Sequence, residues 1–141
     1  MRRQPGFTLL ELLITLAIVV VLGMIAITSY SRYTQRAHRV EAKEALLKIG
    51  QQQERHYTTH HRYLVGDTAL QRFNGGRDVT SGGRYTLEVS GSDSAYTVTA
   101  QAMGAEALRD RQCRRFTLDH TGRQTATAAD GKTTTAECWG R

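Results

Sequence analysis

Cysteine is scarce in this sequence, since Cys113 and Cys138 are the only two among 141 residues. They do not form a CxxC pair or any other close metal-binding spacing, which excludes the common cysteine zinc sites. Two lone cysteines near the end of an exported domain indicate one disulfide, whereas a cytosolic domain would bury them as thiols. In the chain-entropy description, closing a loop of this size contributes about 3 kcal/mol to stability.

The patterns that carry catalysis or nucleotide binding are also missing. There is no HExxH motif and no Ser/His/Asp order, and the glycines of residues 65–83 lack the strand-to-helix context of a phosphate loop. His56 and His60 could share a helix face, with His61 next to them, but no acid cluster accompanies them. We therefore predict no metal site and no cofactor, and we do not expect an enzyme.

Charge is absent from residues 12–31. As a helix this stretch would be about 30 Å long, the thickness of the hydrocarbon core of a bilayer. It is too long for an ordinary secretory signal and no Ala-x-Ala-like cleavage site follows it, so we expect a retained anchor. Arg2 and Arg3 favour a cytoplasmic N-terminus by the positive-inside rule, although three arginines between positions 32 and 39 weaken this argument.

One acid, Glu11, stands at the head of the apolar run. A carboxylate in lipid costs roughly 2.5–3.5 kcal/mol, so such a residue usually has a partner and a function. The simpler alternative is an acid at the interfacial edge of a membrane helix, where the positive helix N-terminus favours it.

The segment Gly6-Phe7-Thr8-Leu9-Leu10-Glu11 and the apolar run after it resemble the N-terminus of the type IV pilin family and its pseudopilin relatives. The resemblance implies that a prepilin peptidase cuts between Gly6 and Phe7 and that the new amine of Phe7 is N-methylated. It also implies that Glu11 pairs with the N-terminal amine of a neighbouring subunit during assembly. A carboxylate and an ammonium, each costly in an apolar bundle, offset one another when two subunits are in register.

The same resemblance predicts the partners, the domains and the location. The partners would be other pilin subunits, the prepilin peptidase, the inner-membrane assembly platform and, before assembly, membrane lipid. The expected domains are a leader at 1–6, a hydrophobic membrane and assembly helix at 7–31, and a periplasmic or extracellular head at 32–141. The chain would cross the bacterial inner membrane once, with its N-terminus cytoplasmic, before joining a fibre at the cell surface.

Beyond Tyr30 the helix is expected to continue as an amphipathic one. Apolar residues recur there at spacings of three and four: Tyr33, Ala37, Val40, Ala42, Ala45, Leu46 and Ile49. We predict that this helix ends between Gly50 and His60. Residues 65–83 contain several glycine turn signals and are predicted to form a loop.

Alternation with a period of two predicts strands in the second half of the chain. The apolar residues of the first two are Tyr85, Leu87 and Val89, then, after a turn at 90–93, Tyr96, Val98 and Ala100. This pattern predicts an antiparallel hairpin with one buried face, which the amphipathic helix can cover. A third strand is predicted at Arg115–Asp119, with a turn at Thr121 and Gly122.

The expected fold class is α+β, with a long N-terminal helix on an antiparallel sheet of three or four strands. Residues 113–122 resemble a strand and turn of many pilins, in which a C-terminal cysteine pair holds a surface loop. Here the disulfide-bounded loop would include residues 125–136, and Trp139 is expected to pack on the sheet near the bridge. The number of strands after residue 122 is left open.

The leading interpretation is a structural subunit of a type IV pilus, most like a PilE-type minor pilin, that supports pilus biogenesis, twitching motility or adhesion. Residues 53–64 loosely resemble the segment after the helix in such pilins. A type II secretion pseudopilin is one alternative. The other is a binding module displayed on the pilus, which captures DNA for uptake or attaches to surfaces.

A basic composition leaves DNA open as a partner, because the formal net charge is +6. The densest group of cations consists of Arg109, Arg111, Arg114 and Arg115. These four are the candidate anion or DNA patch, and a solvated surface is the alternative. Binding to the DNA backbone through such a patch would depend steeply on salt concentration.

Overall fold

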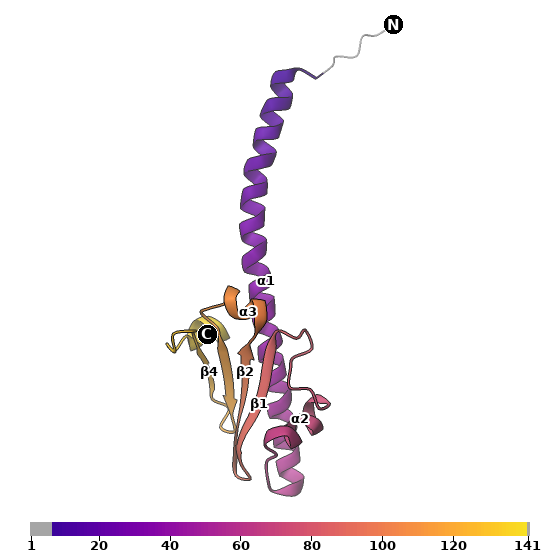
Figure 1. The fold of residues 1–141 in the computed structure, drawn as a ribbon, viewed down its shortest axis with the longest axis vertical. Helices are drawn as coiled ribbons and strands as arrows, with labels where there is room; N and C mark the ends of the chain where they lie inside the picture. The colour runs from indigo at the N-terminus through magenta and orange to yellow at the C-terminus, as the bar shows by residue number, and fades with distance from the viewer. Residues whose placement is uncertain (1–6, 141) are drawn as a thin grey trace. The chain divides into compact units, whose positions relative to one another are not determined.

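The structure is a computed structural model that describes residues 7–140, except for the side chains of Thr28, Ser29 and Arg32. The chain divides into an N-terminal unit that ends at Arg36 and a head that begins at Ala37. Its elements in chain order are one long helix, a short helix, a hairpin, another short helix, two more strands and a last short helix (Figure 1).

The long helix, α1, spans Leu9–His60 and crosses the boundary between the two units. In the N-terminal unit its apolar side chains are exposed, among them Leu9, Val19 and Ile27. Within the described part of the chain, Leu9–Ile27 is the one helical stretch whose length and composition suit a membrane span. This stretch has the properties predicted for the anchor.

In the head, α1 buries one face. Ala42, Leu46, Ile49 and Gln53 are fully buried and follow one another at spacings of four, three and four. The prediction that Tyr33, Ala37 and Val40 belong to a buried stripe is wrong, because all three are exposed. His38 and Arg39, both partly buried, continue this face toward the N-terminus instead, and each contacts a buried acid.

Gly50 lies inside α1 and does not end it. A Cβ atom at this position would come within 2.8 Å of Leu118 Cδ2, so the absence of a side chain lets the helix approach the sheet closely. The Tyr96 hydroxyl also donates to the Gly50 carbonyl across this contact, at 3.4 Å. The helix continues to His60, the far limit of the predicted range, and His61 follows in the left-handed region with a φ of 56°.

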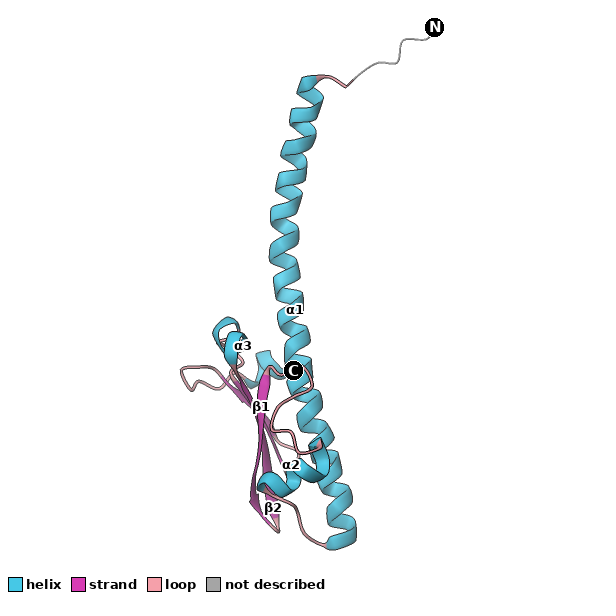
Figure 2. Ribbon diagram, turned by 45° about the vertical axis from the view of Figure 1, so that its right-hand side comes forward, coloured by secondary structure: helices cyan, strands magenta, loops and turns pink. Residues whose placement is uncertain are grey.

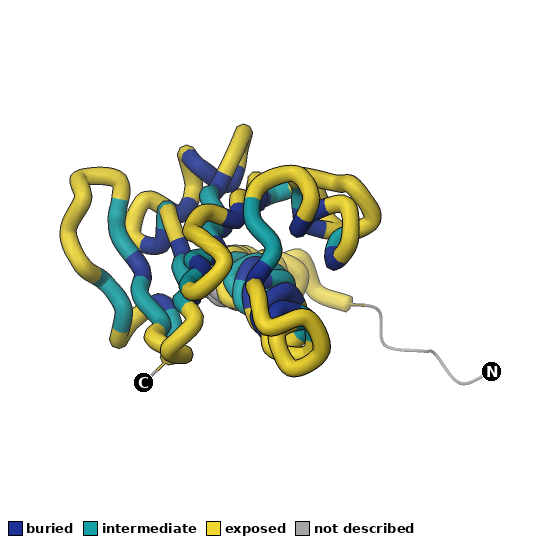
Figure 3. The backbone as a smooth tube through the Cα atoms, turned by 90° about the horizontal axis from the view of Figure 1, so that it is seen from below, coloured by how far each residue is buried: buried dark blue, intermediate teal, exposed yellow. Residues whose placement is uncertain are grey.

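Four antiparallel strands form one sheet in the order β1-β2-β3-β4. Figure 2 shows the strands in magenta beside α1. They span Tyr85–Ser92, Ala95–Ala102, Arg115–Asp119 and Gln124–Thr127. The predicted hairpin and third strand are confirmed, and their alternating apolar residues are buried as expected. Figure 3 colours the buried positions dark blue. Most of the apolar core comes from the strands, α2 and the head part of α1, and Tyr63, Ala107, Cys113 and Cys138 complete it.

The prediction of a loop over residues 65–83 is wrong in its first half, where α2 spans Gly66–Asn74. Ala69, Leu70 and Phe73 lie on one side of this short helix and join the core, which outweighs the turn signals around them. Gly75 then ends the helix in the left-handed conformation, with a φ of 64°.

Two further short helices were not predicted. Helix α3 spans Gly104–Arg109, and α4 spans Thr135–Trp139. The predicted surface loop at 125–136 is therefore shorter than expected, because β4 occupies its start and α4 its end.

A disulfide joins Cys113 to Cys138, whose Cα atoms lie 5.6 Å apart. The bridge spans 25 positions in sequence, for which the chain-entropy description gives about 3.5 kcal/mol. Trp139 packs as predicted: its indole N–H donates to the Thr125 carbonyl at 2.9 Å, and its ring meets Phe116 edge-on. The disulfide and this indole together hold the C-terminus against the sheet.

Candidate functional site

The start of α1 carries the residues that the sequence singled out for assembly. Thr8 caps the helix, because its hydroxyl oxygen accepts from the Glu11 backbone N–H at 3.3 Å. Thr8 and Glu11 thus have the spacing of a capping box, a local signal that the sequence interpretation overlooked. Among the described residues Glu11 makes no ion pair. The predicted cleavage after Gly6 lies outside the described residues.

The four arginines of the candidate DNA patch come from one short segment, but they differ in exposure and in hydrogen bonding. Arg111 and Arg115 are exposed, and Arg115 also donates to Gln101 Oε1 at 2.7 Å. Arg114 is partly buried and donates to the Ala107 carbonyl at 2.8 Å, so it has a structural role. Arg109 ends α3. Arg109, Arg111 and Arg115 are therefore the exposed cations of this group.

A histidine–carboxylate hydrogen bond and an ion pair, both to buried acids, join α1 to the α3 region. His38 Nδ1 lies 2.7 Å from Glu106 Oε2, and Arg39 contacts both carboxylate oxygens of Asp110, at 2.6 and 3.0 Å. Both acids are almost fully buried. The Tyr85 hydroxyl lies in the same region, where burial and then the negative charges of the two acids raise its pKa above the usual value.

A third pair neutralises another arginine of the head. Arg84 Nη1 donates to Glu41 Oε2 at 2.8 Å, and Glu41 Oε1 accepts from the Gly82 backbone N–H. Burial alone would raise the pKa of Glu41, but the hydrogen bonds from Thr80, Arg84 and Gly82 hold it below its usual value. Arg39 and Arg84 thus have acidic partners, which reduces their availability to an external anion.

The histidines at the end of α1 border an open pocket of about 430 Å³ beside α2. The rings of His56 and His60 stack with their centroids 4.1 Å apart. No group of three or more His, Cys, Asp or Glu residues within the described part of the chain is arranged to hold a metal ion. The sequence did not predict this pocket. The pocket depends on α2, and residues 65–83 were expected to form a loop.

Comparison with protein families gives two matches that together run from the N-terminus to β3. Residues 1–27 match the prokaryotic N-terminal methylation motif. Residues 28–117 match a family described as "Type IV minor pilin ComP, DNA uptake sequence receptor". The second match covers more than half of the chain.

Individual relatives are pilins as well. Two sequences from Neisseria gonorrhoeae, both described as "Type IV major pilin protein PilE1", are 32% and 34% identical over 117 and 103 residues. These alignments cover 82% and 72% of this chain but only 62% and 60% of the relatives, so the chain spans about three fifths of their length. A solved type IV pilin from Shewanella oneidensis is 17% identical with a TM-score of 0.49, over 64% of this chain and 89% of that one.

Proposed function

The chain belongs to the ComP family of type IV minor pilins, and on this premise we propose that it is a pilus subunit whose head binds DNA. The observation that carries the proposal is the match over residues 28–117, because the family it identifies is described as a DNA uptake sequence receptor. The matched region contains all of the head through most of β3, including Arg109, Arg111, Arg114 and Arg115. Pilins are structural proteins, and no catalytic activity is proposed.

The N-terminal unit would supply anchoring and assembly. The methylation motif at residues 1–27 supports removal of the leader 1–6 by a prepilin peptidase and methylation of Phe7. The exposed apolar helix supports a single membrane span before assembly. The positive-inside rule favours a cytoplasmic N-terminus for this span in the inner membrane. The chain would then assemble with other pilin subunits on the platform. The proposed functional domains are the leader 1–6, the membrane and assembly helix 7–31, and the segment 32–141, which includes the head that begins at Ala37.

Processing can be tested by mass spectrometry of the chain purified from its native host. We expect the mature protein to begin at Phe7 and to carry one additional methyl group on its N-terminal amine. A Gly6→Leu variant should remain unprocessed, because a bulky residue replaces the small one at the cleavage position. An unmodified N-terminus at Met1 in the unaltered chain, or a cut beyond the apolar helix, would contradict the proposal.

The net positive charge of the mature chain supports DNA as the ligand. Removing the leader takes away Arg2 and Arg3, so the mature chain keeps a formal charge of 6 − 2 = +4. Since Arg39 and Arg84 are paired with acids, the cations available to DNA include the exposed Arg111 and Arg115. Surface arginines of this kind contact phosphates and release counterions when DNA binds.

We expect an Arg111→Ala/Arg115→Ala variant to bind duplex DNA about tenfold more weakly than the unaltered chain. The slope of log affinity against log salt should also fall by about 2, one for each lost phosphate contact. Fluorescence anisotropy at several salt concentrations measures both quantities, with an uptake-sequence duplex and a scrambled duplex. An Arg77→Ala/Arg123→Ala variant removes the same charge from other exposed positions, and neither residue forms a salt bridge within the described part of the chain. Equal losses in the two variants would exclude Arg111 and Arg115 as a specific interface.

Motility and adhesion would follow from membership of a pilus rather than from a separate site. The minor pilin match also favours a pilus over the type II secretion pseudopilin that the sequence left as an alternative. A chain that assembles into pili but binds no DNA at low salt would support the structural role alone.

A further inference from the structure

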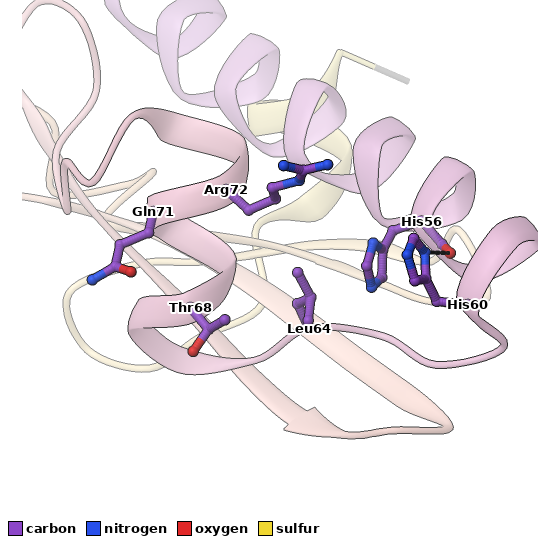
Figure 4. Close-up of a pocket in the computed structure, with 6 residues that line it drawn as sticks. All are labelled: His56, His60, Leu64, Thr68, Gln71 and Arg72. Atoms are coloured by element: carbon purple, nitrogen blue, oxygen red, sulfur yellow. Dashed lines mark hydrogen bonds between the residues drawn. The ribbon is translucent and has the colours of Figure 1, made fainter.

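The pocket beside the last turns of α1 has a lining that suits an anion. Its walls consist of His56 and His60 from α1, Thr68, Gln71 and Arg72 from α2, and Leu64 from the connection between them (Figure 4). Figure 4 shows the two imidazole rings side by side, facing Leu64, with Arg72 extending toward α1. No carboxylate belongs to this lining. The pocket therefore presents hydrogen-bond donors and positive charge without a built-in counter-charge.

The pKa of His56 reflects the same excess of positive over negative charge. The pKa of His56 is lowered first by burial and then by the positive charges of His60, Arg62 and Arg72, and no acid acts in the opposite direction. Within the described part of the chain neither arginine forms a salt bridge. An anion in the pocket would relieve this repulsion, whereas a metal cation would add to it.

One ring of the pocket is held in place by the helix backbone. His60 Nδ1 donates to the His56 carbonyl at 3.2 Å, so His60 Nε2 faces other partners and donates a hydrogen bond to an anion once the ring is protonated. His56 Nε2 is buried and has no hydrogen-bond partner in the described structure. Arg72 offers a planar guanidinium, the side chain best suited to paired hydrogen bonds with phosphate oxygens.

We propose that the pocket formed by His56, His60 and Arg72 is a phosphate-binding site. A phosphate group has the negative charge that the lining lacks and enough acceptor oxygens for the imidazole, hydroxyl and guanidinium donors. The phosphate could belong to the DNA backbone, in which case the site deepens the proposed function and rests on it, or it could be free in solution. The same chemistry recognises both sources.

Phosphate binding should be linked to protonation of the histidines. A bound anion stabilises the imidazolium form, so it raises the pKa of His56 and binds more tightly as pH falls. The charged groups that act on His56 are His60, Arg62 and Arg72, all positive or able to become so. Burial and these positive groups hold the pKa of His56 below its usual value in the empty pocket, and a bound anion acts in the opposite direction.

The test uses the mature full-length chain in detergent micelles and inorganic phosphate as the probe. Histidine NMR signals are followed during a phosphate titration, with chloride keeping the ionic strength constant. We expect the pKa of His56 to rise with phosphate, and the affinity to be about tenfold higher near pH 5.5 than near pH 7.5. A His56 pKa that shifts no further with phosphate than with chloride would overturn the proposal.

An Arg72→Gln variant keeps much of the side chain but removes its charge, and we expect it to weaken phosphate binding at least about tenfold. The matched control is Arg77→Gln, an exposed arginine just after α2 that does not line the pocket. The control should bind phosphate within about twofold of the unaltered chain. Equal effects of the two substitutions would show that phosphate binding depends on the net charge of the chain and not on this pocket, and would overturn the proposal.

A second arm measures duplex DNA binding by the same proteins. If the site takes a backbone phosphate, inorganic phosphate competes with DNA, and Arg72→Gln lowers the salt slope by about 1. If the site takes free phosphate, Arg72→Gln leaves DNA affinity unchanged while phosphate binding is lost. If the chain binds phosphate but does not bind duplex DNA, the proposed function is contradicted and the phosphate site is supported.

Discussion

Replacing Glu11 with alanine is expected to leave the chain in the membrane and to lower its content in sheared pili at least about tenfold. The apolar stretch Leu9–Ile27 is unchanged by the substitution, so membrane insertion should persist. Assembly, in contrast, would lose the one carboxylate at the head of α1 that can offset the N-terminal amine of a neighbouring subunit. The measurement compares an epitope-tagged chain in membrane and sheared fractions of cells that lack the native gene.

A Glu11→Gln variant separates assembly from helix capping. Glutamine can occupy the last position of a capping box as glutamate does, but it has no charge to pair with an amine. The assembly role predicts that Glu11→Gln fails like Glu11→Ala, while Glu44→Ala, at an exposed position of α1, assembles normally. Recovery of pilus incorporation by the glutamine variant would assign Glu11 to the helix cap and not to subunit pairing.

Replacing Arg39 with alanine should destabilise the head by about 3–5 kcal/mol. Asp110 is 1% exposed, and Arg39 contacts both of its carboxylate oxygens. Without the guanidinium, a buried negative charge would keep only the Cys113 backbone N–H, at 3.1 Å, among its described hydrogen-bond donors. Urea unfolding of a soluble chain that begins at Tyr30 measures the loss.

Two further variants identify the cause of that loss. Arg36→Ala removes an exposed arginine one turn away and should change stability by less than about 0.5 kcal/mol. Arg39→Met/Asp110→Leu removes both charges, so we expect it to be more stable than Arg39→Ala. A double variant as unstable as the single one would show that packing, and not an unpaired charge, determines the effect.

The sheet could be predicted because each strand is marked by the alternation of apolar and polar residues within its own short stretch of sequence. Tyr85, Leu87 and Val89 alternate with polar residues, and a shift by one position would expose all three. The same holds for Tyr96 and Val98 in the partner strand. The N-terminal segment was also predictable, since its acid, aromatic residue and long apolar run occur together in sequence.

The short helices were not predictable in the same way. Helix α2 has nine residues, fewer than an isolated helix needs, so it depends on burying Ala69, Leu70 and Phe73 against the rest of the head. Without α2 there was no reason to bring Arg72 near His56. Glu106 and Asp110 are similar, because their positions in the sequence give no sign that His38 and Arg39 lie opposite them.

The strand order β1-β2-β3-β4 has a consequence for how the head folds. Each strand pairs with its neighbour in sequence, so no strand must insert between two others. The β1–β2 and β3–β4 connections are short, and the β2–β3 connection contains α3. The sheet can therefore grow from β1 toward β4 as the chain lengthens. Cys138 lies beyond the last strand and comes late in this order. Oxidation of the two thiols would then act on a sheet that has already formed.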